Sequence, residues 1–414
     1  MTLRDHSLTE ALAQHLLRPI CPDIHQRARL HLLDWMGCVA GARGSAVGAV
    51  QRRMSGQPVT LRAALLGNVL EMDDVHRAAI LHPGPVIWPT VLGDAEQGMN
   101  AVLDAAVRGY EATIAIGASL DAEHYTYWHN TATAGVFGAA AAVACLFGSD
   151  AETIASALGL AGSVSGGLWQ MRHEPVMAKQ WHIAHALQTG GAAAFHAASG
   201  VTGPRFILEG PQGLYAATCR APKPMTMGEG WRIAEVSFKP WGACRHAHPA
   251  IDAALELRSA GKLDGPILIE TFADALAFCD RPEPMTPHEA KFSLQHAAAV
   301  VAARGVPTLA DFEPDAIVAL AGVRSRVTVC EDPAITARYP AHFGARVSAG
   351  GHVVALVDTL GDPERPLSRE GVVDKTRALF AWGELDPAQA ARGIALALDG
   401  DDAVAICSWL EEIL

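Results

Sequence analysis

Three acids and two histidines fall within residues 67–84 of a largely apolar chain: Glu71, Asp73, Asp74, His76 and His82. Neighbouring carboxylates raise one another's pKa, and an unperturbed histidine titrates near about 6.5, so this cluster suits proton transfer near neutral pH or the binding of a cation. A solvated helix end, terminated by His82-Pro83-Gly84, is a further interpretation. The residue types alone leave these alternatives open.

Three other stretches combine histidines or cations with helix ends. His129 lies in an aromatic loop, just before an alanine-rich helix that we expect to begin near Ala134, where it could cap the helix or bind an anion. A helix expected from Met177 to about Ser199 carries Lys179 and two histidines on one face. Between an expected strand and an expected helix, Lys239 to His248 forms a polar stretch that could equally be a solvated loop.

Composition limits the class of protein. The 414 residues are 50% hydrophobic and 18% charged, which predicts a large core and two or more domains. A net charge of −12 with only 32 lysines and arginines argues against partners such as nucleic acid or an anionic membrane, although local cations could still hold an anionic substrate. No apolar run is long enough for a membrane span and no secretory signal is visible, so we expect a cytoplasmic protein.

Two kinds of cofactor motif are missing from the sequence. Its eight cysteines form no C-x-x-C pair, which argues against a zinc knuckle, a thioredoxin-type site or a disulfide scaffold. The glycine-rich stretch 162–168 has the spacing of neither G-x-G-x-x-G nor G-x-x-x-x-G-K-[ST], so it predicts no nucleotide site. We therefore expect no cofactor.

The hydrophobic pattern changes near Arg232. Before it, helical periodicity dominates, including an apolar run from Leu61 to Leu70 that would put the acidic cluster at a helix C-terminus. After it, runs rich in β-branched residues predict strands at 233–238, 267–272, 323–330, 345–348 and 353–357, alternating with helices near 248–259, 290–303, 314–320 and 371–380. The fold class we expect has two domains: a large all-α domain of residues 1–230 joined by helices in 383–414, and a smaller α+β lid domain of residues 231–382.

Six short motifs, taken together and in order, resemble the MmgE/PrpD family over nearly the whole chain. They are Asp73-Asp74 with His82-Pro83-Gly84, the loop from His129 to Gly135, Lys179 with His182, Thr202-Gly203-Pro204 with Leu208-Glu209-Gly210, Lys239-Pro240 through Cys244-Arg245 to Asp252, and Ala290 to Ser293. Members include 2-methylcitrate dehydratase, cis-aconitate decarboxylase and iminodisuccinate epimerase. The resemblance implies a helical domain with an α+β lid, a homodimer, and chemistry without metal or nucleotide.

The match to the family is uneven within the motifs. His82, His129, Lys179 and Lys239 match. Glu71 stands where the family usually has the first Asp of an Asp-aromatic-Asp-Asp-Thr string, Val75 where it has Thr, and Asn68 where it often has His; Cys244 occupies the lid position that is His in the decarboxylases.

The resemblance implies a cofactor-independent lyase that acts on a small anionic di- or tricarboxylate, with a 2-methylcitrate dehydratase-like elimination favoured. We expect the cationic side chains of the motifs to bind the substrate carboxylates, because a charge pair is worth up to about 4 kcal/mol at roughly 4 Å before desolvation is subtracted. The catalytic residues expected are Asp73, His82, His129, Lys179 and Lys239. The substrate-binding residues expected are Glu71, Asp74, His76, Cys244 and Arg245.

Three alternatives stay open. One is an epimerase of an iminodisuccinate-like dicarboxylate that works by proton abstraction. Another is a metal-dependent hydrolase with Asp73, Asp74, His76 and His82 as ligands, since hard or borderline cations accept that mixture. The third is a non-catalytic relative. Because Lys239 comes from the expected lid and His82 from the helical body, we expect an active site between the domains.

Overall fold

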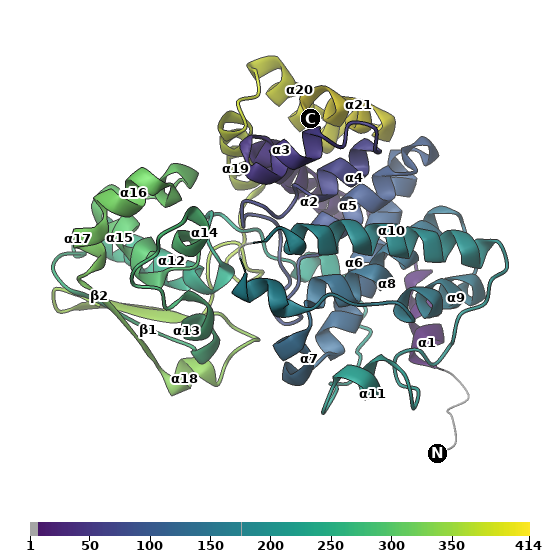
Figure 1. The fold of residues 1–414 in the computed structure, drawn as a ribbon, viewed down its shortest axis with the longest axis horizontal. Helices are drawn as coiled ribbons and strands as arrows, with labels where there is room; N and C mark the ends of the chain where they lie inside the picture. The colour runs from purple at the N-terminus through teal and green to yellow at the C-terminus, as the bar shows by residue number, and fades with distance from the viewer. Residues whose placement is uncertain (1–6, 175) are drawn as a thin grey trace. The chain divides into compact units, whose positions relative to one another are not determined.

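The computed structural model describes residues 7–174 and 176–414, which divide into two compact units (Figure 1). Of the described residues, unit 1 contains 7–69, 73–236 and 369–414, and unit 2 contains 70–72 and 237–368. The chain therefore enters unit 2 once for only three residues and again for its main segment. The short segment 70–72 and the main segment 237–368 each contain residues of the expected site.

Unit 1 is built from helices, and its described residues contain no strand, as the sequence predicts for 86–200. The α-helices are α1 (Leu8–Leu16), α2 (Pro22–Gly41), α3 (Ala46–Arg52), α4 (Val59–Ala64), α5 (Gly84–Leu92), α6 (Met99–Ser119), α7 (Ala122–Tyr127), α8 (Asn130–Leu146), α9 (Ala151–Gly162), α10 (Ala178–Ala198), α11 (Leu214–Thr218), α19 (Arg369–Trp382), α20 (Pro387–Asp399) and α21 (Ala403–Ile413). Short 3-10 helices lie at Ala42–Gly44, Ala95–Gln97, Trp169–His173 and Arg232–Glu235.

Helix α8 lies in the core of unit 1, buried along its length except at Cys145, and packs against α6 and α10 (Figure 1). The three helices approach closely because glycines face their neighbours. A Cβ at Gly138 of α8 would lie 1.7 Å from Thr113 Oγ1 of α6, and one at Gly190 of α10 would lie 2.5 Å from the Ala139 Cβ. No larger side chain fits at these contacts. The packing therefore fixes the position of α8, and with it the helix N-terminus, relative to α6 and α10.

The acidic cluster does not lie at a helix C-terminus, contrary to the expectation from sequence. Helix α4 ends at Ala64, and turns and loop carry the chain to α5. Within this loop Glu71 and Ile80 have positive φ of 57° and 50°, which is uncommon for non-glycine residues and a rare setting for a β-branched one. The bond from His76 N to Leu81 O, 2.9 Å, closes a turn over residues 76–81. The apolar sequence pattern continues past the end of α4 because the residues of this loop are themselves buried.

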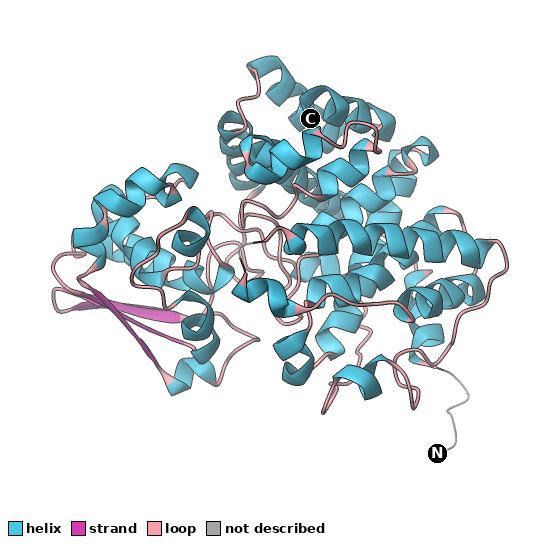
Figure 2. Cartoon of the chain, viewed as in Figure 1, coloured by secondary structure: helices cyan, strands magenta, loops and turns pink. Residues whose placement is uncertain are grey.

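Unit 2 contains one four-stranded sheet with helices packed against it (Figure 2). Its strands are β1 (Ile267–Thr271), β2 (Val327–Glu331), β3 (Ala345–Ala349) and β4 (His352–Leu356), in the order β2-β1-β3-β4. The β1–β2 pair is parallel, and the other two pairs are antiparallel. The α-helices are α12 (His248–Ser259), α13 (Ala273–Cys279), α14 (Pro287–Lys291), α15 (Leu294–Arg304), α16 (Pro314–Ala319), α17 (Ala321–Arg324) and α18 (Pro333–Thr336), with 3-10 turns at Arg245–Ala247 and Leu309–Phe312.

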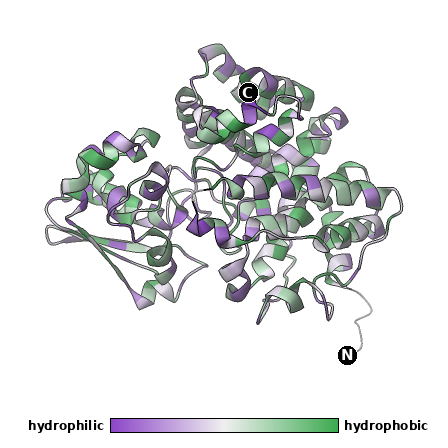
Figure 3. Cartoon of the chain, viewed as in Figure 1, coloured by the Kyte–Doolittle hydropathy of each residue, from purple (hydrophilic) through white to green (hydrophobic). Residues whose placement is uncertain are grey.

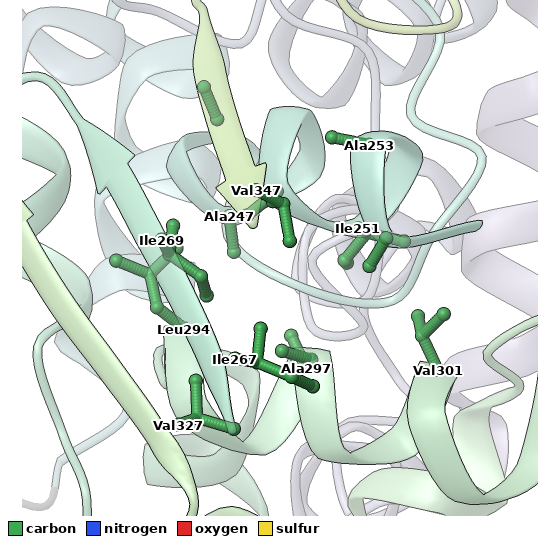
Figure 4. Packing of buried hydrophobic residues seen from close by; sticks show 14 of the residues in the cluster. Ala247, Ile251, Ala253, Ile267, Ile269, Leu294, Ala297, Val301, Val327 and Val347 are labelled. Atoms are coloured by element: carbon green, nitrogen blue, oxygen red, sulfur yellow. The ribbon is translucent and has the colours of Figure 1, made fainter. Parts of the chain in front are cut away.

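The core of unit 2 forms where α12 and α15 meet the sheet (Figure 4). Ile267 and Ile269 of β1 alternate with more exposed residues, so one face of the strand is apolar. That face packs in one cluster with Ile251 of α12 and Leu294 of α15. Runs rich in β-branched residues are the reason why β1, β3 and β4 could be predicted from sequence.

Two sequence-based expectations differ from the structure. Residues 233–238 form no strand: a 3-10 helix, Arg232–Glu235, runs into extended chain. Ile233, Val236 and Phe238 are buried there at uneven spacing, so their apolar character reflects burial rather than sheet pairing. Helix α19 belongs to unit 1, where it packs on α2, although the sequence placed it in the second domain.

Most helices carry hydrophobic and hydrophilic residues around one circumference (Figure 3), as expected when one face packs in a core and the other meets water. In the described part of the chain, no helix combines the length and apolar character that crossing a bilayer requires.

Candidate active site

The tautomer of His82 follows from its contacts. Its Nδ1 lies 2.8 Å from the Asp74 carbonyl oxygen and 3.0 Å from Asp73 Oδ2. A carbonyl oxygen only accepts, so Nδ1 carries the proton and donates it, and Nε2 keeps a lone pair. The His82 side chain is 18% exposed, while the Asp73 carboxylate is buried. The pair therefore offers a proton acceptor on a partly exposed ring beside a buried acid.

The loop that carries His82 is attached to the start of α8. The His82 backbone N donates to Thr131 Oγ1 at 3.1 Å, and Asn130 Nδ2 donates to the Ala79 carbonyl at 3.0 Å. Both partners belong to the first turn of α8, whose unpaired backbone N–H groups and dipole favour a negative charge nearby. These two hydrogen bonds therefore fix the loop, and with it His82, relative to the start of α8.

His129 is the N-cap residue of α8, and its side chain makes no capping bond. Its Nδ1 lies 3.2 Å from Nδ1 of His182 on α10, so at least one of the two rings must be neutral there. Burial and then the charge of His185 hold the pKa of His182 below its usual value, which favours the neutral ring. The ring of Trp169 covers His129 at a centroid distance of 4.5 Å. The histidine pair can thus pass a proton between its members.

Lys179 lies in the first turn of α10, three residues before His182. Residues three apart lie on one face of a helix, so the lysine shares a face with the histidine that contacts His129. Lys179 is half-buried. His82 and His129 are thus both attached to the start of α8, Asp73 lies beside His82, and Lys179 shares a helix face with His182.

Asp74 accepts three hydrogen bonds inside unit 1. Its Oδ2 accepts from His31 Nδ1 at 2.8 Å and from the Tyr110 hydroxyl at 2.6 Å, and its Oδ1 accepts from Gly84 N at 2.9 Å. A Cβ at Gly84 would lie 2.7 Å from that carboxylate. These bonds join α2, α5 and α6 to the loop. They favour a structural role for Asp74 over the substrate contact expected from sequence.

Buried histidines predict that unit 1 loses stability in acid. Burial lowers the pKa of His31 and of His124 from 6.5 to about 4. Between these values the unfolded chain takes up protons that the folded chain refuses, so the unfolding free energy falls as pH drops from 6.5 to 4, by up to about 3 kcal/mol for each ring. Burial raises the pKa of Asp34 to about 6, which acts in the opposite direction and is outweighed.

Urea unfolding at about pH 7 and about pH 4.5 measures this effect. The midpoint should be lower in acid, and His124→Gln should show a smaller difference between the two pH values. A midpoint that rises on acidification would contradict the assignment of neutral rings.

His76 has both ring nitrogens engaged. Nδ1 accepts from Ala79 N at 3.2 Å, so Nε2 carries the proton and donates to Glu235 Oε2 at 3.1 Å. The side chain of Glu235 is half exposed and that of His76 is buried. The contact ties the loop to the 3-10 helix Arg232–Glu235, which favours a structural role for His76 as well.

Unit 2 contains a second group of expected site residues. Lys239 is fully buried, and its Nζ lies 3.4 Å from Oε2 of Glu71, which belongs to the three-residue segment 70–72. Lys291 Nζ donates to the Leu70 carbonyl of the same segment at 3.3 Å. Two lysines from unit 2 therefore hold the segment that leads directly into Asp73.

Cys244 and Arg245 follow in the same loop and point to different partners. Cys244 Sγ lies 3.2 Å from His246 Nδ1. Arg245 donates to Asp362 Oδ1 at 2.5 Å and to the Leu360 carbonyl at 3.1 Å, and it is 4% exposed. The guanidinium is committed within unit 2, which favours a structural role over the carboxylate clamp expected from sequence.

The proposed metal ligands do not converge. Among residues 7–174 and 176–414, the group of three or more His, Cys, Asp or Glu side chains with ligand atoms within 4.8 Å of one another is His342, Asp358 and Glu364. Asp74 and His76 instead direct their polar atoms to protein partners, as described above. This geometry disfavours a hydrolase that uses Asp73, Asp74, His76 and His82 as ligands.

The expected site residues leave out four that complete these contacts: His182, named only in the motif with Lys179, Glu235, His246, and Cys279, whose thiol forms a hydrogen bond with Cys244. His182 could have been found, since it lies three positions after Lys179 on one helix face. His246 lies two positions after Cys244. Glu235 and Cys279 are brought to their partners by the fold, and nothing in their local sequence marks them.

Comparison with known proteins covers most of the chain. The model of the MmgE/PrpD N-terminal domain matches residues 43–226, and that of the MmgE/PrpD C-terminal domain matches residues 241–399. The chain is 26% identical over 282 residues to cis-aconitate decarboxylase of Homo sapiens, across 63% of this chain and 58% of the relative. It is 25% identical over 281 residues to the cis-aconitate decarboxylase-like protein oryM of Aspergillus oryzae, across 57% of this chain and 58% of that relative.

The aligned part is thus less than two thirds of the length of either relative. The two domain matches follow each other in the order of the motifs and together leave only the chain ends and a short junction unmatched. The chain belongs to the MmgE/PrpD family.

Proposed function

We propose that this protein is a lyase that acts on a small di- or tricarboxylate by acid–base chemistry. The observation that carries the proposal is the His82 ring, whose Nδ1 donates to the Asp74 carbonyl beside the Asp73 carboxylate, so that the lone pair of Nε2 can accept a proton. Membership of a family whose similar members are named as cis-aconitate decarboxylases supports a carboxylate substrate.

In the elimination that we favour, His82 Nε2 takes a proton from a carbon next to a carboxylate. The electron pair of that C–H bond forms the double bond, and the β-hydroxyl leaves as water with a proton from the His129–His182 pair. The buried Asp73 carboxylate stabilises the imidazolium that forms. The ammonium of Lys179 and the N-terminus of α8 offset the negative charge of the substrate carboxylates.

Deuterium labelling tests the reaction type. Purified protein is incubated in heavy water with citrate-like hydroxy acids, cis-aconitate and iminodisuccinate, and the products are followed by NMR. Loss of water identifies a dehydratase, loss of carbon dioxide identifies a decarboxylase, and label at a stereocentre without net change identifies an epimerase. Absence of any turnover or label would contradict the proposal.

A chelator should leave this activity unchanged. The ligand atoms that a metal would need at Asp74 and His76 already donate to or accept from protein groups. Activity is compared before and after dialysis against a chelator, then after addition of Zn²⁺, Mg²⁺ or Mn²⁺. Activity that is lost on chelation and restored by one of these ions would replace acid–base chemistry with metal catalysis.

Two expectations from sequence extend the proposal. Lys239 and Glu71 are proposed to serve the same substrate as His82, which double variants of Lys239 and His82 can test through the non-additivity of their kinetic effects. The protein is also proposed to be a homodimer, and light scattering at micromolar concentration gives the mass that decides it.

A further inference from the structure

Unit 2 contains three ligand-type side chains that the proposed reaction does not use. His342, Asp358 and Glu364 each offer one nitrogen or oxygen atom, and these atoms lie within 4.8 Å of one another. His342 precedes β3, whereas Asp358 and Glu364 follow β4, so the three residues come from two loops that flank one β-hairpin. A metal site needs this convergence of ligand atoms from separate parts of the chain.

The sheet brings His342 and Asp358 together. Strands β3 and β4 are antiparallel, and Ala345 at the start of β3 pairs with Leu356 at the end of β4. The chain before β3 and the chain after β4 therefore leave the same end of the sheet. A Cβ at Gly344 would lie 2.7 Å from the Leu356 carbonyl oxygen, so the two segments stay close together as they leave it. His342 Nδ1 and Asp358 Oδ1 meet just beyond this point, at 2.7 Å.

Glu364 lies in a turn that hydrogen bonds hold in shape. Gly361 N donates to the Arg365 carbonyl at 2.8 Å, and Arg365 N donates to the Asp362 carbonyl at 3.0 Å. The buried Asp362 carboxylate also accepts from Ser237 Oγ at 2.6 Å, which ties the turn to the rest of unit 2. The backbone around the group is thus fixed in advance, and the exposed Glu364 side chain is the part that can adjust to an ion.

The group is open to solvent, so a dissolved ion can reach it. The side chains of His342 and Asp358 are 37% and 13% exposed. Arg365 also lies close, since its Nη1 donates to the Asp358 carbonyl at 3.2 Å, but its Nη2 donates to Glu256 Oε1 at 3.1 Å and is balanced there. A divalent cation held by two carboxylates and a neutral imidazole gives a site without net charge.

We propose that His342, Asp358 and Glu364 bind one borderline divalent cation such as Zn²⁺, with water completing the coordination. Zn²⁺ accepts imidazole nitrogen and carboxylate oxygen together, whereas Mg²⁺ and Ca²⁺ prefer oxygen ligands. Two ligand atoms about 2.1 Å from one zinc ion lie at most about 4.2 Å apart, so a small rotation of Glu364 is enough to close the set. The ion takes the place of the proton that His342 and Asp358 share, and it joins the two loops at this end of the hairpin.

Zinc binding in the absence of substrate tests the proposal. The parent protein is the full chain with Cys21→Ser and Cys330→Ser, which remove two exposed thiols that would bind zinc themselves. After removal of metal, it is titrated with ZnCl₂ by isothermal titration calorimetry. We expect one equivalent to bind with an affinity that His342→Ala lowers by at least about a hundredfold, since even the loss of a residue behind a ligand costs about 10- to 100-fold. Glu364→Gln, which keeps the size of an exposed side chain, should weaken the same binding event.

His352→Ala is the matched control, because it removes an exposed histidine at the opposite end of β4. It should bind zinc as the parent protein does. Thermal unfolding followed by circular dichroism shows whether each variant is folded. Zn²⁺ should raise the unfolding temperature of the parent protein and of His352→Ala by more than that of His342→Ala or Glu364→Gln.

Equal zinc titrations in the parent protein and in the His342 and Glu364 variants would place any bound zinc elsewhere on the chain and overturn the inference. Displacement of the zinc by an equal concentration of Mg²⁺ would overturn the assignment of the cation class. Because the titration contains no substrate, its result is independent of the activity measurements that test the proposed reaction.

Discussion

His82→Ala is expected to lower kcat on the true substrate by at least about a hundredfold, since a positioned acid or base typically contributes about 10² to 10⁴ in rate. Alanine removes the nitrogen whose lone pair the Asp73 and Asp74 contacts leave available. The ring is partly exposed, so its loss should leave the unfolding temperature close to wild type. Steady-state kinetics and a thermal melt measure the two quantities.

Lys179→Ala should lower activity by a similar factor, but through lost substrate binding rather than lost proton transfer. Removing an ammonium that pairs with a substrate carboxylate weakens binding in the ground state and in the transition state, so KM should rise as kcat falls. His196→Ala, which removes an exposed histidine near the end of α10, is a control for both variants and should leave kinetics unchanged. Wild-type kinetics in the His82 and Lys179 variants would show that other residues carry the reaction.

The second large effect is expected on stability. Asp74→Ala removes the acceptor of three buried donors, from His31, Tyr110 and Gly84, and each unsatisfied buried group costs about 1–3 kcal/mol. We expect the free energy of unfolding to fall by about 3–5 kcal/mol, which approaches the whole stability of many domains. Urea unfolding monitored by circular dichroism measures the change from the midpoint.

Asp401→Ala provides the matched comparison, because it removes a fully exposed carboxylate that lies 3.8 Å from Arg29. An exposed ion pair is worth about 0–1 kcal/mol, so this variant should unfold close to wild type. Equal midpoints for the Asp74 and Asp401 variants would refute the structural role of Asp74. A stable Asp74→Ala protein with lost activity would return Asp74 to the substrate.

Much of the secondary structure could be predicted from sequence because the signals are local. The helix expected from Met177 to about Ser199 is α10, Ala178–Ala198, and the runs rich in β-branched residues after residue 260 contain the strands of one sheet, although Val323 and Arg324 of the run 323–330 are helical. Predictions failed where burial, rather than periodicity, set the composition. The run from Leu61 to Leu70 is apolar because its turn is buried, and residues 233–238 contain buried Ile233 and Val236 without forming a strand.

The site could be predicted in its residues more than in their roles. Motif resemblance selected His82, Asp73 and His129, which the structure joins to the same helix terminus. It also selected Asp74, whose partners His31 and Tyr110 come from α2 and α6, far away in the chain. Local sequence does not report such long-range bonds, so it cannot separate a carboxylate that meets substrate from one that ties helices together.

The packing of α19 on α2 has a consequence for biosynthesis. Lys375 of α19 pairs with buried Asp34 of α2 at 2.5 Å, and Leu379 lies against Gly37. All of unit 2 is translated between these two helices, which at about 5–20 residues per second delays the arrival of α19 by on the order of ten seconds. Until α19 is synthesised, the apolar face of α2 that it covers stays exposed, and Asp34 lacks its Lys375 partner. Unit 2 can therefore finish folding first, although most of unit 1 precedes it in the chain.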